Sequence, residues 1–156
     1  MAARIYSVGL ISDTHGLLRP RAAAALAGSD YIIHAGDIGA PEILEQLAQI
    51  APVTAVRGNN DQVPWAAHIR DTEVLRVGSA GIYVIHDVAE LDPGAAAGFA
   101  AVIAGHSHKP GQALRDGVLY VNPGSAGPRR FRLPVSVGRL RIEGAKVEAE
   151  LITLEV

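Results

Sequence analysis

Side chains bearing oxygen and nitrogen follow short apolar runs at several points in this sequence. Asp13 and His15 lie two positions apart after the apolar segment 8–11, so in an extended chain they point to the same side. Groups of the same kinds follow other apolar runs: Asp37, Asn59, His86, His106 and His108. Carboxylate, amide and imidazole groups together suit Mn, Fe, Zn, Ni or Co. The pattern predicts a metal site assembled from several separate loops.

This set is too large for one tetrahedral ion. It suits two ions roughly 3.5–4 Å apart, bridged by a carboxylate and a hydroxide. Asp37 is the natural bridge, because one carboxylate can give an oxygen to each ion. Two cations neutralise the oxygens of a phosphate ester and lower the pKa of the bridging water. Hydrolysis of phosphate esters is therefore the expected chemistry, and it requires no nucleophilic serine or cysteine.

The elements that must position these groups alternate in the first part of the chain. Strands are expected over residues 5–11, 30–34 and 52–56, with helices starting at Pro20 and Pro41. Strand–helix alternation predicts right-handed βαβ units and a mostly parallel sheet. Ligands of such sheets bind beyond the carboxyl ends of the strands, which is where the first candidate ligands fall.

The second part of the chain is richer in strands and turns. These strands are expected to form a second, more antiparallel sheet packed on the first, and they span residues 72–77, 81–86, 100–104, 118–121, 135–142 and 146–154. The fold class is therefore α/β, a sandwich of two mixed sheets packed face to face and flanked by helices. We expect residues 1–156 to form a single domain.

Composition narrows the classes of protein. The chain has 156 residues, 49% of them hydrophobic, with no cysteine and a net charge of −2. The absence of cysteine excludes disulfides and thiolate metal sites. The charge gives no electrostatic basis for binding nucleic acid or an anionic membrane. No signal peptide or membrane-spanning run is evident, so a cytoplasmic protein is expected.

Five ordered blocks resemble the motifs of the calcineurin-like metallophosphoesterases. These blocks read Asp13-x-His15, Gly36-Asp37, Gly58-Asn59-x-Asp61, His86 and Gly105-His106-x-His108. The short chain and the elements at 34–37 and 122–125 resemble the small bacterial and archaeal phosphodiesterase branch of that family. The similarity runs from about residue 5 to about residue 130. The family architecture, two sheets flanked by helices, agrees with the strand pattern.

The resemblance implies two divalent metal ions and a small phosphate ester substrate, with a diester expected before a monoester. Manganese is the first expectation, and Ni, Fe, Zn and Co also fit. One ion would be held by Asp13, His15 and His108, and the other by Asn59, His86 and His106. Asp37 would bridge the two ions. The resemblance also implies catalytic roles for Asn59, which orients a phosphate oxygen, for His106, and for Asp61, which fixes a ligand or a nearby histidine.

Two positions depart from the family pattern. Many members have a histidine directly after the motif asparagine, where it can protonate the leaving group, whereas this chain has Asn60. The small branch also often has His-Gly-His around the third block, whereas this chain has His86, Asp87 and Val88. Asp87 adds negative charge where an anionic substrate would bind. These departures bear on rate and substrate range more than on metal binding.

Other polar residues have simpler interpretations. His34 is expected to pack or to hydrogen-bond behind the ligands, and His68 to lie on the surface or in a helix. A basic cluster, Arg129, Arg130 and Arg132, either belongs to a solvated surface or contacts the substrate phosphate or a partner subunit.

Two alternatives to a small-molecule phosphodiesterase have the same fold. One is a protein-binding scaffold, since the family contains a trafficking subunit in which a metal ligand is replaced, but none of the matched ligands is replaced here. The other is a nuclease, which the charge and the single small arginine cluster disfavour. A homodimer or a higher homo-oligomer is a further expectation.

Overall fold

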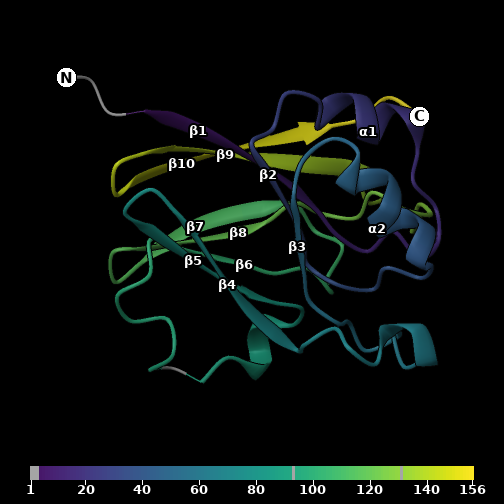
Figure 1. Ribbon diagram of the computed structural model, residues 1–156, viewed down its shortest axis with the longest axis horizontal. Helices are drawn as coiled ribbons and strands as arrows, with labels where there is room; N and C mark the ends of the chain where they lie inside the picture. Colours follow the sequence, from purple (N-terminus) through teal and green to yellow (C-terminus); the bar gives the residue numbers. More distant parts are fainter. Residues whose placement is uncertain (1–3, 93, 131) are drawn as a thin grey trace.

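Every apolar run expected to form a strand does so in the computed structural model, which describes residues 4–92, 94–130 and 132–156 (Figure 1). The elements in chain order are β1 (Ile5–Ile11), α1 (Pro20–Ala25), β2 (Tyr31–His34), α2 (Pro41–Ala48), β3 (Val53–Ala55), η1 (Pro64–Ala66), β4 (Thr72–Val77), β5 (Ala80–Ile85), η2 (Val88–Glu90), β6 (Ala101–Ile103), β7 (Gly111–Arg115), β8 (Val118–Asn122), β9 (Ser136–Glu143) and β10 (Lys146–Thr153).

The first sheet has five strands in the order β10-β9-β1-β2-β3. Its three N-terminal strands are parallel, as expected, whereas β9 pairs antiparallel with β1 and β10 with β9. The expectation that β9 and β10 belong to the second sheet is therefore wrong. β9 buries Val137, Leu140 and Ile142 completely, and its Gly138 lets the Leu10 side chain approach closely, so β9 forms an interior strand beside β1.

The second sheet has five strands in the order β4-β5-β6-β8-β7. It is mixed, because β5, β6 and β8 are parallel while β4 and β7 pair antiparallel at the edges. Sequence reasoning missed β7. This edge strand is mostly exposed, and Leu114 on it is 71% exposed, so it lacks the burial pattern that identifies a strand.

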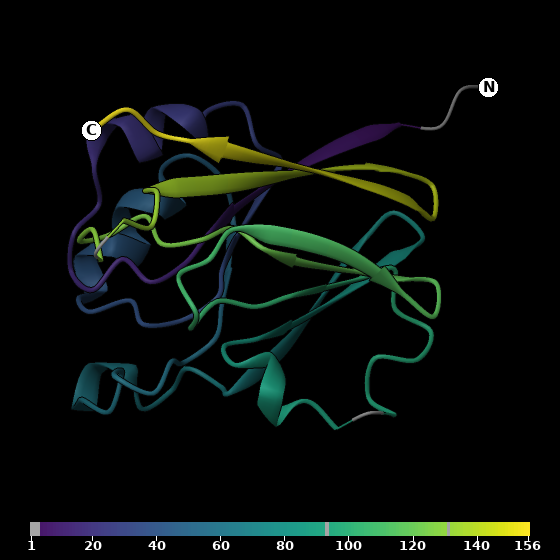
Figure 2. The ribbon, with the colours of Figure 1, turned by 180° about the vertical axis from the view of Figure 1, so that it is seen from behind.

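The core fills the space between the sheets, which lie one above the other in Figures 1 and 2. Leu10 and Ile33 of the first sheet share an apolar cluster with Ile82 and Ile103 of the second. Both α-helices begin with proline at the first turn and pack on the outer face of the first sheet. The α1 segment does so through Ala22 and the following Leu26, and α2 through Ile43 and Leu47. Across the described residues, the outer face of the second sheet is covered by the segment around η2 instead of α-helices.

The carboxyl ends of the parallel strands of both sheets meet at one edge of the sandwich. The loops there are joined by backbone hydrogen bonds, with Asp13 N–H donating to Gly36 C=O and Gly105 N–H donating to His86 C=O, both at 2.9 Å. The His106 N–H, which follows a strand of the second sheet, donates to Asp13 Oδ2 of the first at 3.1 Å, so the loops of the two sheets are also joined to each other. In the described chain, none of the helices has the length and apolar character needed to span a membrane.

Candidate metal centre

The backbone of the candidate ligands is held in an unusual conformation. Six non-glycine residues of the described chain have positive φ, and five of them are candidate ligands: Asp13, His15, Asp37, His106 and His108. The left-handed region costs a non-glycine residue roughly 1–2 kcal/mol, and such strain persists where the surrounding structure enforces it. Strain concentrated on these five residues indicates that the loops are shaped for function.

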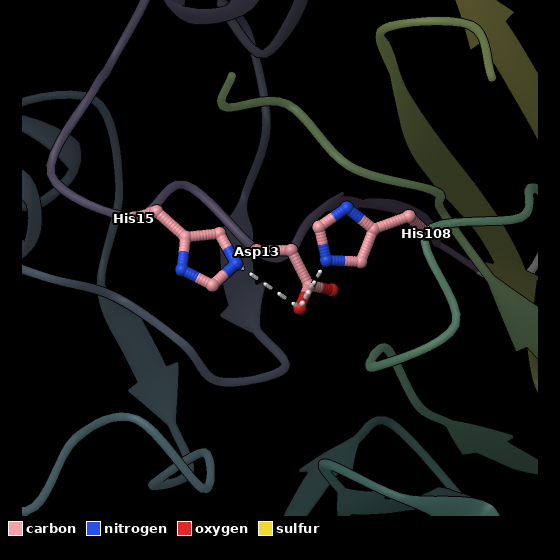
Figure 3. Close-up of side chains that lie close together, drawn as sticks. All are labelled: Asp13, His15 and His108. Carbon is pink, nitrogen blue, oxygen red and sulfur yellow. Dashed lines mark ion pairs between the residues drawn. The ribbon is translucent and has the colours of Figure 1, made fainter. Parts of the chain in front are cut away.

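The first cluster consists of Asp13, His15 and His108. Asp13 is fully buried, and its Oδ1 lies 3.4 Å from His108 Nε2 and 3.9 Å from His15 Nε2. Figure 3 shows the two imidazole rings flanking the carboxylate. Ligand atoms about 2.0–2.2 Å from one metal ion lie about 2.8–3.6 Å apart, so the cluster needs only a small contraction to hold an ion.

The second cluster consists of Asp13, Asp37 and His86. Asp37 Oδ2 lies 3.3 Å from His86 Nε2 and 3.8 Å from His15 Nε2, so it faces one histidine of each expected ligand set. His86 Nδ1 donates to the Ala35 carbonyl at 2.6 Å, which leaves Nε2 directed at the carboxylates. Asp13 belongs to both clusters, so either carboxylate is placed to be shared.

The four central groups have perturbed acid–base behaviour. Burial raises the pKa of Asp13, and burial lowers the pKa of His108. Burial is the largest single influence on Asp37 and His86 and opposes their charged forms. Their mutual contact at 3.3 Å, the Asn60 N–H on Asp37 and the Ala35 carbonyl on His86 together outweigh it, lowering the pKa of Asp37 to about 2 and raising that of His86. Without metal, the centre therefore combines an Asp37–His86 ion pair with a poorly solvated Asp13.

The unpaired polar atoms at the centre are of the kinds that bind divalent cations. Asp13 Oδ1, His15 Nε2, His86 Nε2 and His108 Nδ1 are buried and have no hydrogen-bond partner among the described residues. Buried polar groups are ordinarily paired, and leaving each one unpaired costs about 1–3 kcal/mol. Divalent cations bound by nitrogen and oxygen donors would satisfy most of them. The residues present therefore fit the metal ions that the sequence predicts.

Several residues behind the ligands support them, and of these Ser12 was not singled out from the sequence. The Ser12 hydroxyl donates to Asp13 Oδ2 at 2.7 Å. Asn60 donates to Asp37 twice, from its backbone N–H at 2.9 Å and from its side-chain amide at 3.2 Å. Asn60 therefore orients a ligand, which is a role that its position directly after Asn59 could have suggested. His34 is buried as expected, with Nε2 3.0 Å from the Thr14 hydroxyl.

Asp61 supports the ligands through the backbone. Its buried carboxylate accepts from the N–H groups of Ile38 at 3.0 Å, Gly39 at 3.2 Å and Gly58 at 3.0 Å. These N–H groups flank Asp37 and Asn59. Among the described residues Asp61 makes no hydrogen bond to an imidazole, so it holds two loops in place instead of orienting a histidine.

The remaining candidate ligands lie at the edge of an open cavity of about 920 Å³ beside the centre. Asn59 is exposed, and the His106 side chain is 45% exposed with Nε2 3.7 Å from Asp87. The His106 ring lies edge-on to that of His86, with centroids 5.2 Å apart. The structure therefore brings five of the seven candidate ligands together and leaves Asn59 and His106 on the cavity wall.

Residues outside the motifs lie where simple interpretations place them. His68 is exposed, as expected. Arg129, Arg130 and Arg132 are also exposed, and the charge of Arg130 contributes to the lowered pKa of His108 after burial. Arg130 is therefore the member of this basic cluster that lies near enough to His108 to affect its charge.

Comparison with known proteins agrees with this geometry. Residues 6–145 match the calcineurin-like phosphoesterase superfamily domain, and the chain belongs to that family. A probable metallophosphoesterase from Methanothermobacter thermautotrophicus is 35% identical over 160 residues, covering 93% of this chain and 91% of the relative. The resemblance read from the five motif blocks is confirmed.

Solved structures share the fold. A novel archaeal phosphodiesterase superposes with a TM-score of 0.78 at 23% identity, covering 95% of this chain and 99% of the other. The zinc complex of Vps29 from Entamoeba histolytica superposes with a TM-score of 0.73 at 22% identity, covering 92% and 89%. These matches confirm the architecture of two mixed sheets. The zinc complex also shows that a protein of this fold binds a divalent metal.

Proposed function

We propose that this protein is a metal-dependent phosphodiesterase that hydrolyses a small phosphate diester at a site for two divalent ions. The observation that carries the proposal is the pair of buried clusters sharing Asp13, with unpaired ligand atoms beside an open cavity. When bound, two divalent ions neutralise phosphoryl oxygens and make a water acidic enough to attack near neutral pH. Manganese is the first expectation, and the donor set also accepts Zn, Fe, Ni or Co.

The position of each candidate residue suggests its role in binding the ions or the substrate. Asp13, His15 and His108 would hold one ion, and His86 with the adjacent His106 and Asn59 would hold the other, with Asp37 between them. Asn59 would orient a phosphate oxygen that enters from the cavity. Asn60 donates its backbone N–H and its side-chain amide to Asp37 and is not an acid, so the leaving group either departs without a proton or takes one from water. Esters of acidic alcohols are therefore the favoured substrates.

The test combines metal analysis with turnover. Purified protein loaded with Mn²⁺ should contain two ions per chain and cleave bis(p-nitrophenyl) phosphate. His108→Ala should lower both the metal content and the turnover, whereas the matched control His68→Ala removes an exposed histidine and should change neither. If the protein holds metal but leaves diesters and monoesters intact, the phosphodiesterase proposal fails. A stable stoichiometric partner with no bound metal would instead favour the scaffold.

A further inference from the structure

The cavity beside the metal centre has a distinct acidic wall. At its inner end it is lined by His86, a 95% buried residue whose Nε2 has no partner among the described residues, and by Asn59 and His106. Asp87 and Glu90 line the cavity on the side of η2. A phosphate that enters the centre from this cavity therefore shares the cavity with these two carboxylates, and Asp87 lies beside His106.

The acidic charge is not cancelled by the basic group in the same cavity. Arg57 also lines the cavity, but it donates to the Asp71 carboxylate at 3.1 and 3.3 Å. Asp87 Oδ1 accepts from Ala89 N–H at 3.0 Å, which fixes the side chain with Oδ2 3.7 Å from His106 Nε2. The cavity lining therefore has a net negative charge. The hydrogen bond from Ala89 holds the Asp87 carboxylate beside His106, a candidate metal ligand.

We propose that Asp87 and Glu90 make this site select singly charged phosphate diesters over doubly charged phosphate monoesters. The inference rests on the proposed function and names its substrate class by charge. Metal ions attract both kinds of ester, but a monoester carries one more negative charge, which the acidic wall repels. One unit charge about 8 Å away in partly solvated surroundings changes an equilibrium by about a factor of ten.

The experiment compares two substrates that share a leaving group and differ in charge. Methyl p-nitrophenyl phosphate is a monoanion, and p-nitrophenyl phosphate at pH 8 is a dianion. In Mn²⁺-loaded Asp87→Asn protein, the monoester kcat/KM relative to that of the diester should rise about tenfold, and Asn can still accept the hydrogen bond from Ala89. Glu90→Gln should shift the ratio in the same direction. The control, Glu150→Gln, removes a carboxylate on β10 and should leave the ratio unchanged.

Binding gives a readout that does not depend on turnover. Inorganic phosphate at pH 8 is a dianion and dimethyl phosphate a monoanion, so calorimetry with Mn²⁺-loaded protein should show tighter phosphate binding in Asp87→Asn and little change for dimethyl phosphate. Added salt should weaken this difference. If wild-type protein turns over neither ester, the proposed function fails, and the charge inference is decided by the phosphate affinity alone. A ratio and a phosphate affinity within twofold of wild type in both variants would overturn the inference.

Discussion

Replacing Asp61 by alanine removes the acceptor for two buried backbone N–H groups, those of Ile38 and Gly58, and for the more exposed N–H of Gly39. Each buried donor left without an acceptor costs about 1–3 kcal/mol. The exposed N–H of Gly39 can donate to water instead. We therefore expect Asp61→Ala to lower the free energy of unfolding by about 2–6 kcal/mol, a large part of the 5–15 kcal/mol typical of a domain.

Two further variants sharpen this test. Asp61→Asn keeps one acceptor oxygen but turns an amide N–H₂ toward a backbone donor. Its free energy of unfolding should therefore lie between those of wild type and Asp61→Ala. Asp71→Ala is the matched control, because that carboxylate is 77% exposed and pairs with Arg57 at the surface, where an ion pair contributes about 0–1 kcal/mol. Urea denaturation in EDTA at pH 7 measures all three. A loss below 1 kcal/mol in Asp61→Ala, or an equal loss in Asp71→Ala, would refute the role assigned to the buried carboxylate.

Three other substitutions probe the centre. In EDTA, Asp13→Asn should be at least as stable as wild type, because burial raises the pKa of this carboxyl and therefore disfavours its charged form, which the amide lacks. With Mn²⁺, urea denaturation should show that the variant loses most of the metal-dependent stabilisation. Burial lowers the pKa of His34 to about 3, so the unfolded chain binds more protons between about pH 3 and 6.5, and stability falls as the pH is lowered through this range. His34→Gln should remove up to about 1.4 kcal/mol per pH unit of that slope, and equal slopes at pH 4–6 would contradict it. Gly58→Ala would place a methyl group against the backbone and carboxylate of Asp37, so Mn²⁺ titration should show at least roughly tenfold weaker binding, unlike Gly111→Ala, which has open space.

The local pattern of apolar residues was enough to predict most of the strands of this fold, but not which strands pair with one another. Apolar runs identified the strands, because burial on both faces leaves a clear signal in residue type. Nothing local distinguishes the sheet that β9 joins, since that choice depends on its fit beside β1, where Gly138 admits the Leu10 side chain. The edge strand β7 has too little burial to be recognised by its residue types.

The candidate site shows the same division between local and distant signals. Ligand types and their order predicted the five central residues, and the structure groups them in two clusters. The resemblance predicted that Asp61 fixes a ligand or a histidine. The backbone groups that it holds could not be predicted, because Ile38 and Gly39 lie 22–23 positions away in the chain. Asn60 likewise contacts Asp37 across 23 positions. Candidate ligands can be recognised in a sequence by their residue types and spacing. Residues that hold those ligands in place can be recognised only from contacts in the structure.

The strain at the centre explains why so much of its support comes from the backbone. Five candidate ligands adopt positive φ, and at roughly 1–2 kcal/mol each their combined strain is comparable to the stability of a whole domain. Such loops hold their shape without metal only if other bonds enforce it, and the hydrogen bonds from Asp13 N–H to Gly36 and from Gly58 N–H to Asp61 do so. A metal ion would then bind ligand atoms that are already in position, and little of its binding free energy would be spent on ordering the loops.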